Sequence, residues 1–269
     1  MTKKIFTLLL LVSPFLAIAQ QPDKMAHYVA TLNANDSVAI WLCRYDEVAW
    51  VSSDSVSASP KEQMAKLGKQ WFCFRENKTW HAVYGKYENG VFNTVFHYIV
   101  DTARKIKRIY TAVDSFLAGS LSRALINADE KMKKYLDTNY VLRFNQYVRK
   151  NPDNTIAVWL FPAFQTNGTA VYGAEFYYKY DAKGNNLLDK YEYFQGKFRG
   201  FKTGQKRDIY INYTDLEEPS LGAVFFARYY KPYFTNITIE VKHMDSQLFN
   251  DNGNYTWISA IKEEREKDK

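Results

Sequence analysis

Several features that define other classes of protein are scarce in this chain of 269 residues. It has two cysteines, 12 glycines and seven prolines, which excludes a small disulfide-linked scaffold and a collagen-like fibre. Beyond the N-terminal segment, no apolar run approaches the roughly 18 residues that a membrane-spanning helix needs. Hydrophobic residues make up 46% and charged residues 24% of the chain, which are ordinary values for a folded globular protein.

Motifs for several common chemistries are also missing. No glycine-rich phosphate loop precedes a predicted helix, and no G-x-S-x-G elbow is present. Acidic residues such as Glu175 and the pair Glu217-Glu218 are plentiful, but no spacing singles out a general acid/base pair. The sequence therefore predicts no cofactor.

Residues 1–19 have the pattern of a secretory signal peptide. Lys3 and Lys4 supply a positive start, an apolar stretch follows, and Ala17-Ile18-Ala19 offers a small-x-small cleavage site before Gln20. The apolar stretch is too short for a membrane anchor, and no cysteine follows it for lipid attachment. We therefore expect an exported chain, periplasmic or secreted, with no lipid anchor and no membrane span after the signal is removed.

The charge of the expected mature chain is modest. Removing two lysines leaves 34 basic residues against 29 acidic ones, a net charge of +5. This charge favours solubility and weak attraction to anionic surfaces, and it does not indicate nucleic-acid binding. The expected partner is a protein or a glycan in the envelope or outside the cell, and no nucleic acid.

Apolar runs and turn residues predict an α+β fold in two regions. In residues 20–150, an antiparallel β-meander covers 70–111 and helices follow over 114–149. In residues 151–269, a second β-rich half surrounds a helix that begins just after Pro219-Ser220. Before the meander, residues 38–51 have the composition of a strand.

Cys43 and Cys73 both lie in apolar segments that resemble buried strands. An even number of cysteines in an oxidising compartment permits a disulfide. The alternative is two inert thiols that act as small buried side chains. Both alternatives remain open, whereas a catalytic cysteine is not expected because neither apolar setting would lower a thiol pKa.

His81 and His97 lie on the two arms of a predicted hairpin at Asn89-Gly90. A two-residue turn would put the two side chains on opposite faces, and a three-residue loop would place them directly opposite each other. Zinc binding needs the second register and a third ligand, which no C-x-x-C or H-x-x-x-H spacing supplies. We favour two histidines on a half-buried sheet, and they are metal candidates only if a metal is found.

Residues 210–223 and the order of elements around them resemble the metal-site segment of the JAB/MPN (JAMM) metallopeptidase fold. That family carries a strand ending in His-x-His, a loop, and a Ser followed three residues later by an Asp at a helix start. Counting back from Ser220 puts Tyr210 and Asn212 at the His positions and Ala223 at the Asp position. Because Tyr and Asn are poor zinc ligands and Ala is none, the resemblance implies a degenerate scaffold without its metal.

A signal peptide without a complete catalytic set favours an exported, non-catalytic binding protein. One alternative is a divergent, peptidase-like metal-dependent hydrolase that uses His81 or His97. A second alternative is an envelope-associated structural protein that touches anionic surfaces.

Overall fold

The fold is described from a computed structural model, which defines residues 5–136, 142–251 and 253–262. Its helices and strands confirm the predicted α+β class. The helices are α1 (Ile5–Ser57), α2 (Lys61–Met64), α3 (Ser115–Lys133) and α4 (Leu221–Tyr230). The strands are β1 (Gln70–Glu76), β2 (Thr79–Glu88), β3 (Val91–Val100), β4 (Ile106–Ile109), β5 (Phe144–Lys150), β6 (Ile156–Pro162), β7 (Thr169–Tyr180), β8 (Leu187–Lys202), β9 (Ile209–Tyr213), β10 (Ile237–Val241), β11 (Met244–Asp251) and β12 (Asn254–Ile261).

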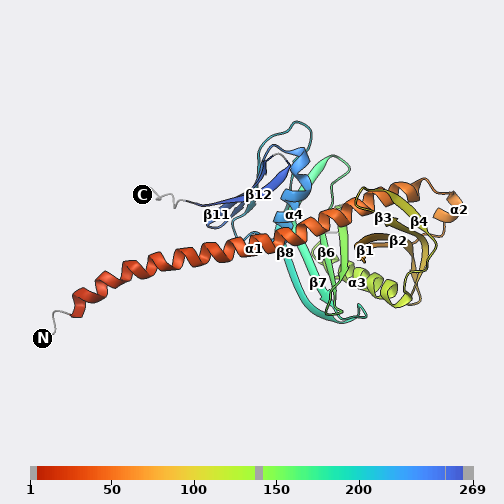
Figure 1. The fold of residues 1–269 in the computed structure, drawn as a ribbon, viewed down its shortest axis with the longest axis horizontal. Coiled ribbons are helices and arrows are strands. Elements are labelled where there is room, and N and C mark those ends of the chain that lie inside the picture. The colour runs from red at the N-terminus through yellow and green to blue at the C-terminus, as the bar shows by residue number, and fades with distance from the viewer. Residues whose placement is uncertain (1–4, 137–141, 252, 263–269) are drawn as a thin grey trace.

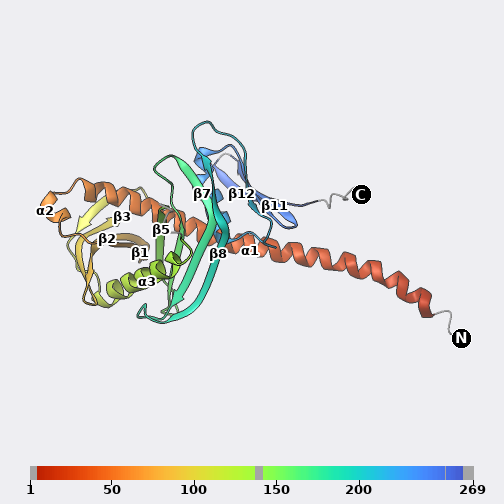
Figure 2. The ribbon, with the colours of Figure 1, turned by 180° about the vertical axis from the view of Figure 1, so that it is seen from behind.

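Three four-stranded sheets lie along helix α1. Their strand orders are β1-β2-β3-β4, β5-β6-β7-β8 and β12-β11-β10-β9. In both ribbon views α1 passes all three sheets, while α3 lies on the other side of the first two (Figure 1, Figure 2). The first turns of α1 extend beyond the body of the molecule in both views. None of the helices in the described part of the chain combines the length and apolar character needed to cross a membrane.

In the sheet β5-β6-β7-β8, strands β6 and β7 are buried on both faces, as is the middle of β5, whereas β8 is largely exposed. Tyr147 and Trp159 belong to the cluster of buried residues under α1 and α4, whereas Val148 and Val158 belong to the cluster under α3. Consecutive residues of a strand point to opposite faces, so both kinds of position are apolar here. The cluster under α1 extends from Tyr28 to Met244 and includes side chains from both regions expected from the sequence.

Strands β9 and β10 are parallel, whereas every other strand pair in the described residues is antiparallel. Helix α4 connects them, because parallel neighbours need a crossover. The helix begins where the sequence predicted, and the Ser220 side chain caps it by accepting a hydrogen bond from the amide of Ala223 at 3.2 Å.

Polar contacts join α1 to α4 within this core. Asp46 on α1 is 6% exposed and accepts hydrogen bonds from Tyr229 at 2.7 Å and from Tyr147 at 3.2 Å. Earlier on the same helix, Asp36 forms a bidentate ion pair with Arg228, with nitrogen–oxygen distances of 2.5 and 2.6 Å. These contacts satisfy polar groups that would otherwise be buried without partners.

The expected strand character of residues 38–51 is wrong, because this segment lies inside α1. Its buried side chains include Ala39, Leu42, Tyr45 and Ala49, which recur every three or four residues. That spacing forms one stripe on a helix and packs against the first two sheets. The β-branched and aromatic composition suggested a strand, but packing of the stripe determines the structure.

The expected helices over 114–149 are correct only for the first part. Helix α3 ends at Lys133, and Phe144–Lys150 is strand β5, paired with β6; residues 137–141 lie outside the described residues. Tyr147 and Val148 are both buried, on opposite faces of the sheet. A strand that is buried on both faces does not alternate between apolar and polar residues, so its sequence can be mistaken for that of a helix.

Candidate functional site

The candidate site begins with an irregularity in strand β7. Gly173 has a φ of +100°, and the pairing of β7 with β8 shifts on either side of it. Tyr172 contacts Phe226 of α4, and Glu175 contacts the amide of Gly222 at the start of α4. Residues three apart in a regular strand face opposite sides, so the irregularity brings Glu175 onto the face that α1 and α4 cover.

Glu175 is a buried acid with incomplete pairing. Its side chain is 2% exposed, and the backbone N–H of Gly222 donates to Oε2. Oε1 is buried and makes no hydrogen bond with any described residue. Burial raises the pKa of the Glu175 carboxyl to about 7, although the nearby Ser220 and Tyr191 hydroxyls and the Gly222 amide oppose the rise.

The close approach of Glu175 to α4 requires a glycine. A Cβ added to Gly222 would lie 2.0 Å from Glu175 Oε2 and 3.0 Å from its Cβ. The Gly222 N–H has no acceptor within the helix and donates to the Glu175 carboxyl instead. The helix dipole favours negative charge at this end of α4. This contact offsets only part of the rise in the pKa of Glu175, because burial has the larger effect.

A row of three aromatic side chains crosses the sheet beside Glu175. Trp159 on β6 pairs with Tyr177 on β7, and Tyr177 pairs with Tyr191 on β8. Directly paired residues share a face, and Tyr177 shares that face with Glu175 two residues before it. The centroids of the Trp159 and Tyr177 rings are 5.6 Å apart. We call Trp159, Tyr177 and Tyr191 the aromatic row.

The aromatic row and Glu175 line an open pocket of about 770 Å³, which we call the Glu175 pocket. Its other walls are α1 and the loop of residues 214–219 that precedes α4. This loop is attached to α1, because Asn35 donates to the carbonyl of Pro219 at 2.9 Å and His27 lies 3.1 Å from Glu218. The volume lies within the range of small-molecule sites.

The described lining of the Glu175 pocket is rich in acidic residues. Glu217 and Glu218 line it together with Glu175, and of the described lining residues none is a lysine or arginine. Aromatic faces beside carboxylates can stack on a ligand and can accept hydrogen bonds or positive charge from it. This lining suits an uncharged or cationic group better than an anion.

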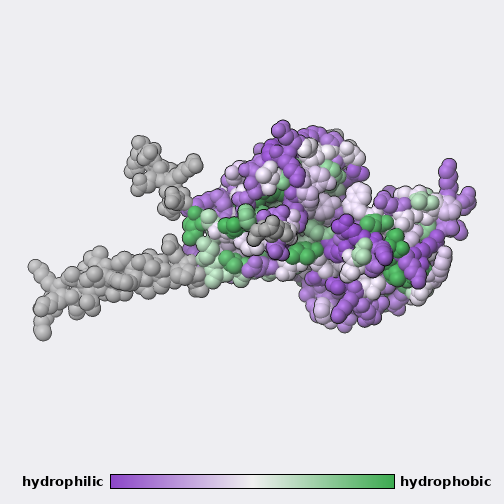
Figure 3. Space-filling model, turned by 45° about the horizontal axis from the view of Figure 1, so that its top comes forward, coloured by the Kyte–Doolittle hydropathy of each residue, from purple (hydrophilic) through white to green (hydrophobic). Residues whose placement is uncertain are grey.

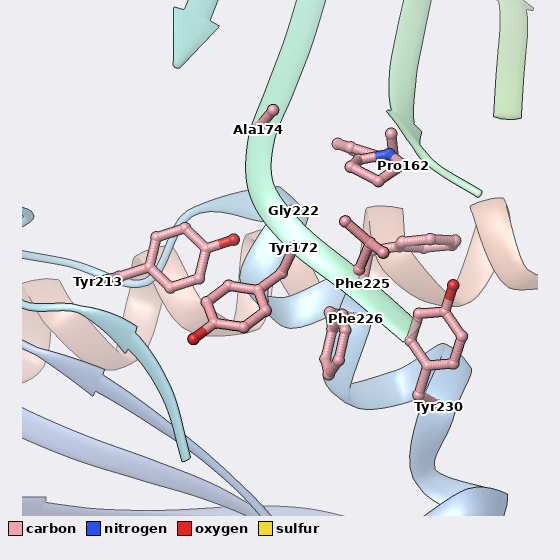
Figure 4. Close-up of a pocket in the computed structure, with 10 residues that line it drawn as sticks. Pro162, Tyr172, Ala174, Tyr213, Gly222, Phe225, Phe226 and Tyr230 are labelled. Atoms are coloured by element: carbon pink, nitrogen blue, oxygen red, sulfur yellow. The ribbon is translucent and has the colours of Figure 1, made fainter. Parts of the chain in front are cut away.

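The described residues also enclose other hollows. The gap beneath α4 in Figure 4 is lined mainly by apolar and aromatic side chains such as Phe225, Phe226 and Tyr230, and its volume is about 10 Å³. This is room for about one water molecule, so the gap is a seam in the core. A second open pocket, of about 630 Å³, shares His27, Glu217 and Glu218 with the Glu175 pocket, and its lining also contains Lys24 and Lys262.

Exposed hydrophobic residues do not form a single dominant surface on the face in Figure 3. Hydrophilic residues cover most of that face, and hydrophobic ones gather in separate patches between them. Exposed apolar side chains elsewhere in the described chain include Phe249 and Ile258 on the third sheet. Scattered exposed apolar residues are normal for a folded protein and identify no site.

His81 and His97 meet in a register that the sequence did not predict. The turn at Asn89-Gly90 has two residues, since Glu88 pairs with Val91, but a bulge beside Gly85 then shifts the register. His97 consequently pairs with Val83, two residues beyond His81 and on the same face. The predicted two-residue turn is confirmed and its register holds as far as Gly85, but neither alternative included the bulge, so neither gave the pairing of His97 with Val83.

The two imidazoles form a hydrogen-bonded pair. His97 Nδ1 lies 2.9 Å from the Thr111 carbonyl oxygen, and His97 Nε2 lies 2.9 Å from His81 Nδ1. The carbonyl can only accept, so in the neutral pair Nδ1 of His97 donates to it and Nε2 accepts from His81. Burial and the neighbouring His97 lower the pKa of His81. Within the described residues, no group of three or more His, Cys, Asp and Glu side chains could hold a metal ion.

Cys43 and Cys73 are both free thiols in the structure. Cys43 lies on α1 rather than on the strand expected from its apolar neighbours, while Cys73 is buried on β1 as predicted. Burial raises the pKa of Cys43 to about 12 and raises the pKa of Cys73 well above its usual value. These thiols are unsuited to nucleophilic chemistry.

The four positions matched to the JAB/MPN motif do not come together in the structure. Ser220 and Ala223 are buried together at the start of α4. Tyr210 on β9 is exposed, and the Asn212 side chain accepts a hydrogen bond from Thr214 at the end of that strand. Alternation along β9 turns Tyr210 and Asn212 away from the buried face. The resemblance itself stays a prediction.

Comparisons with protein-family models, with curated proteins and with solved structures give no match to this chain.

Sequence reasoning named Glu175 only as one of many acids and did not identify the aromatic row. A signal was available, because Glu175 is the one acidic residue in the apolar run 170–178. An acid in a strand buried on both faces is rarely accidental, since burial of an unpaired carboxylate is costly. The contact of Glu175 with Ser220 and Gly222 at the start of α4 could not be foreseen from spacing.

Proposed function

We propose that this chain is an exported, non-catalytic binding protein whose ligand site is the Glu175 pocket. The observation that carries the proposal is an open pocket of about 770 Å³ in which an aromatic row lies beside a buried, incompletely paired carboxyl. Such a combination offers contact area together with a few oriented polar groups. The ligand is a small organic molecule, or the exposed end of a glycan or a protein partner.

Export is the other part of the proposal, and the position of the buried residues supports it. Tyr28 is the first buried residue among the described side chains of α1. Cleavage after Ala19 would remove the first turns of α1, which extend beyond the body (Figure 1), and would keep every buried residue among the described side chains of the helix. Intact-mass measurement of the protein from its host should give a chain that begins at Gln20. A chain that retains Met1 would contradict this.

Binding is tested with a thermal-shift panel of sugars, amino acids and amines on the wild-type protein. A ligand of the Glu175 pocket should raise the melting temperature of the wild type and lose this effect in Tyr191→Ala. Tyr210→Ala is the matched control, because Tyr191 is 45% exposed and Tyr210 is 58% exposed on a different sheet. If every stabilising compound acts equally on both variants, the Glu175 pocket is not the ligand site.

A further inference from the structure

We propose that the Glu175 pocket binds an organic ammonium group, which lies against the aromatic row and pairs with the Glu175 carboxylate. This inference rests on the proposed function and names the chemical class of its ligand. It follows from three properties of the pocket: a carboxyl oxygen without a hydrogen-bond donor, the aromatic rings beside it, and the absence of a cationic partner for that carboxyl.

The unpaired acceptor is Oε1 of Glu175. This atom is buried and makes no hydrogen bond with any described residue, although the Ser220 and Tyr191 hydroxyls lie near the carboxyl, and Glu175 is one of the residues that line the pocket. The Gly222 amide occupies only the other oxygen. A buried carboxylate with a vacant acceptor is costly, and a ligand that brings both a donor and a positive charge removes that cost. An ammonium group brings both.

The aromatic row supplies faces that attract cations. Trp159, Tyr177 and Tyr191 lie side by side because they are directly paired across three strands. Trp159 is 4% exposed and already has the Arg149 guanidinium 5.2 Å from the centroid of its ring, so Tyr177 and Tyr191 are the members of the row that can receive a ligand cation. Cation–π contacts of this type contribute about 0.5–2 kcal/mol each, depending on solvent exposure.

The charged groups around Glu175 leave it without a cationic partner. Facing it are Tyr191 on β8, Tyr213 on β9 and Ser220 at the start of α4, and none of these is a base. Of the remaining charged groups in the Glu175 pocket, Glu218 pairs with His27, while Glu217 pairs with Lys242 and His243.

Other ligand classes fit this arrangement less well. An anion would meet the Glu175 carboxylate, which has no cationic partner, and the described lining contains no lysine or arginine to attract it. A neutral sugar could stack on the aromatic row, but it would leave the ionised Glu175 without a countercharge. The ammonium class alone uses the aromatic faces and the negative charge together.

The test is isothermal titration of the full chain at pH 8 with 1,4-diaminobutane and with its neutral counterpart 1,4-butanediol. The two probes have nearly the same length and shape but differ in charge. We expect the diamine to bind and the diol to bind at least about tenfold more weakly. Equal binding of the two probes, or no binding of the diamine, would overturn the inference.

Three variants locate the site. Glu175→Gln should weaken diamine binding by about tenfold or more, and Tyr191→Ala by about three- to tenfold. Tyr210→Ala should leave it within about twofold of the wild type. Circular dichroism verifies that each variant is folded, and the exposed Tyr191 provides a test even if Glu175→Gln does not fold. Diamine binding that is the same in all three variants would refute the inference.

The two proposals fail in different ways. If a sugar from the thermal-shift panel depends on Tyr191 and the diamine does not bind, the Glu175 pocket is a ligand site but the ammonium class is wrong. If no compound of either class depends on Tyr191, the proposed function itself is wrong.

Discussion

Replacement of Glu175 by Gln should change how the stability of the protein depends on pH. Glutamine has almost the same shape, and its amide oxygen can still accept the hydrogen bond from Gly222. The substitution removes only the ability to ionise in a site that is 2% exposed. Any change in the pH dependence of unfolding can therefore be assigned to the carboxyl group.

The sign and size follow from the pKa of Glu175, which burial raises from 4.5 to about 7 in the native protein. Between these two values the native state holds a proton that the unfolded state has lost, so the free energy of unfolding falls as pH rises. One pKa unit corresponds to about 1.4 kcal/mol, which gives a total loss of about 3 kcal/mol. Most of this loss, about 2–3 kcal/mol, lies between pH 5 and pH 8.

Urea unfolding of the wild type and of Glu175→Gln at pH 5 and pH 8 measures this effect. The variant should be more stable relative to the wild type at pH 8 than at pH 5, by about 2–3 kcal/mol. Other titrating groups are common to both proteins and cancel in the comparison. The same stability difference at both pH values would refute the reasoning and would show that the carboxyl is solvated in the native state.

Three further substitutions test other contacts of the structure by urea unfolding. Hydrogen bonds from lysine and tyrosine side chains outweigh the effect of burial on Glu192 and lower its pKa to about 2. Glu192→Gln should therefore cost about 1–2 kcal/mol at pH 7 after allowance for solvent screening, and most of this cost should be lost by pH 2. A cost that is the same at both pH values would contradict this assignment. Gly222→Ala should cost about 2–3 kcal/mol because its Cβ would lie 2.0 Å from Glu175 Oε2, whereas Gly119→Ala on α3, with its nearest neighbour at 3.5 Å, should be neutral or stabilising by up to about 1 kcal/mol. Similar stability of the two glycine variants would show that the start of α4 can move away. Asp46→Ala should cost about 3 kcal/mol because the buried Tyr147 hydroxyl and the half-buried Tyr229 hydroxyl lose their acceptor. Asp46→Asn keeps an acceptor oxygen and should cost about 1 kcal/mol. Equal costs for these two variants would mean that the hydrogen bonds do not stabilise the α1–α4 contact.

The sequence alone determined the elements whose signals are local. The meander over β1–β4 follows from turn residues between apolar runs, and the turn at Asn89-Gly90 has positive φ at both positions, of 52° and 82°. Helix α3 begins after Asp114, whose side chain accepts from Leu117 N, and α4 begins after Ser220, both as predicted. In each case one or two residues suffice, because a cap or a turn satisfies backbone groups within the same few residues.

Only the tertiary structure decided the parts that depend on contacts between distant segments. Strand β11 was not predicted at all, and β5 resembled a helix because both of its faces are buried. One bulge in β2–β3 placed His81 beside His97, and an irregularity at Gly173 turned Glu175 toward α4. Spacing along the chain sets which face a residue takes only while a strand remains regular. The Glu175 pocket is assembled from α1, three strands and a loop, so its chemistry exists only after those elements pack together.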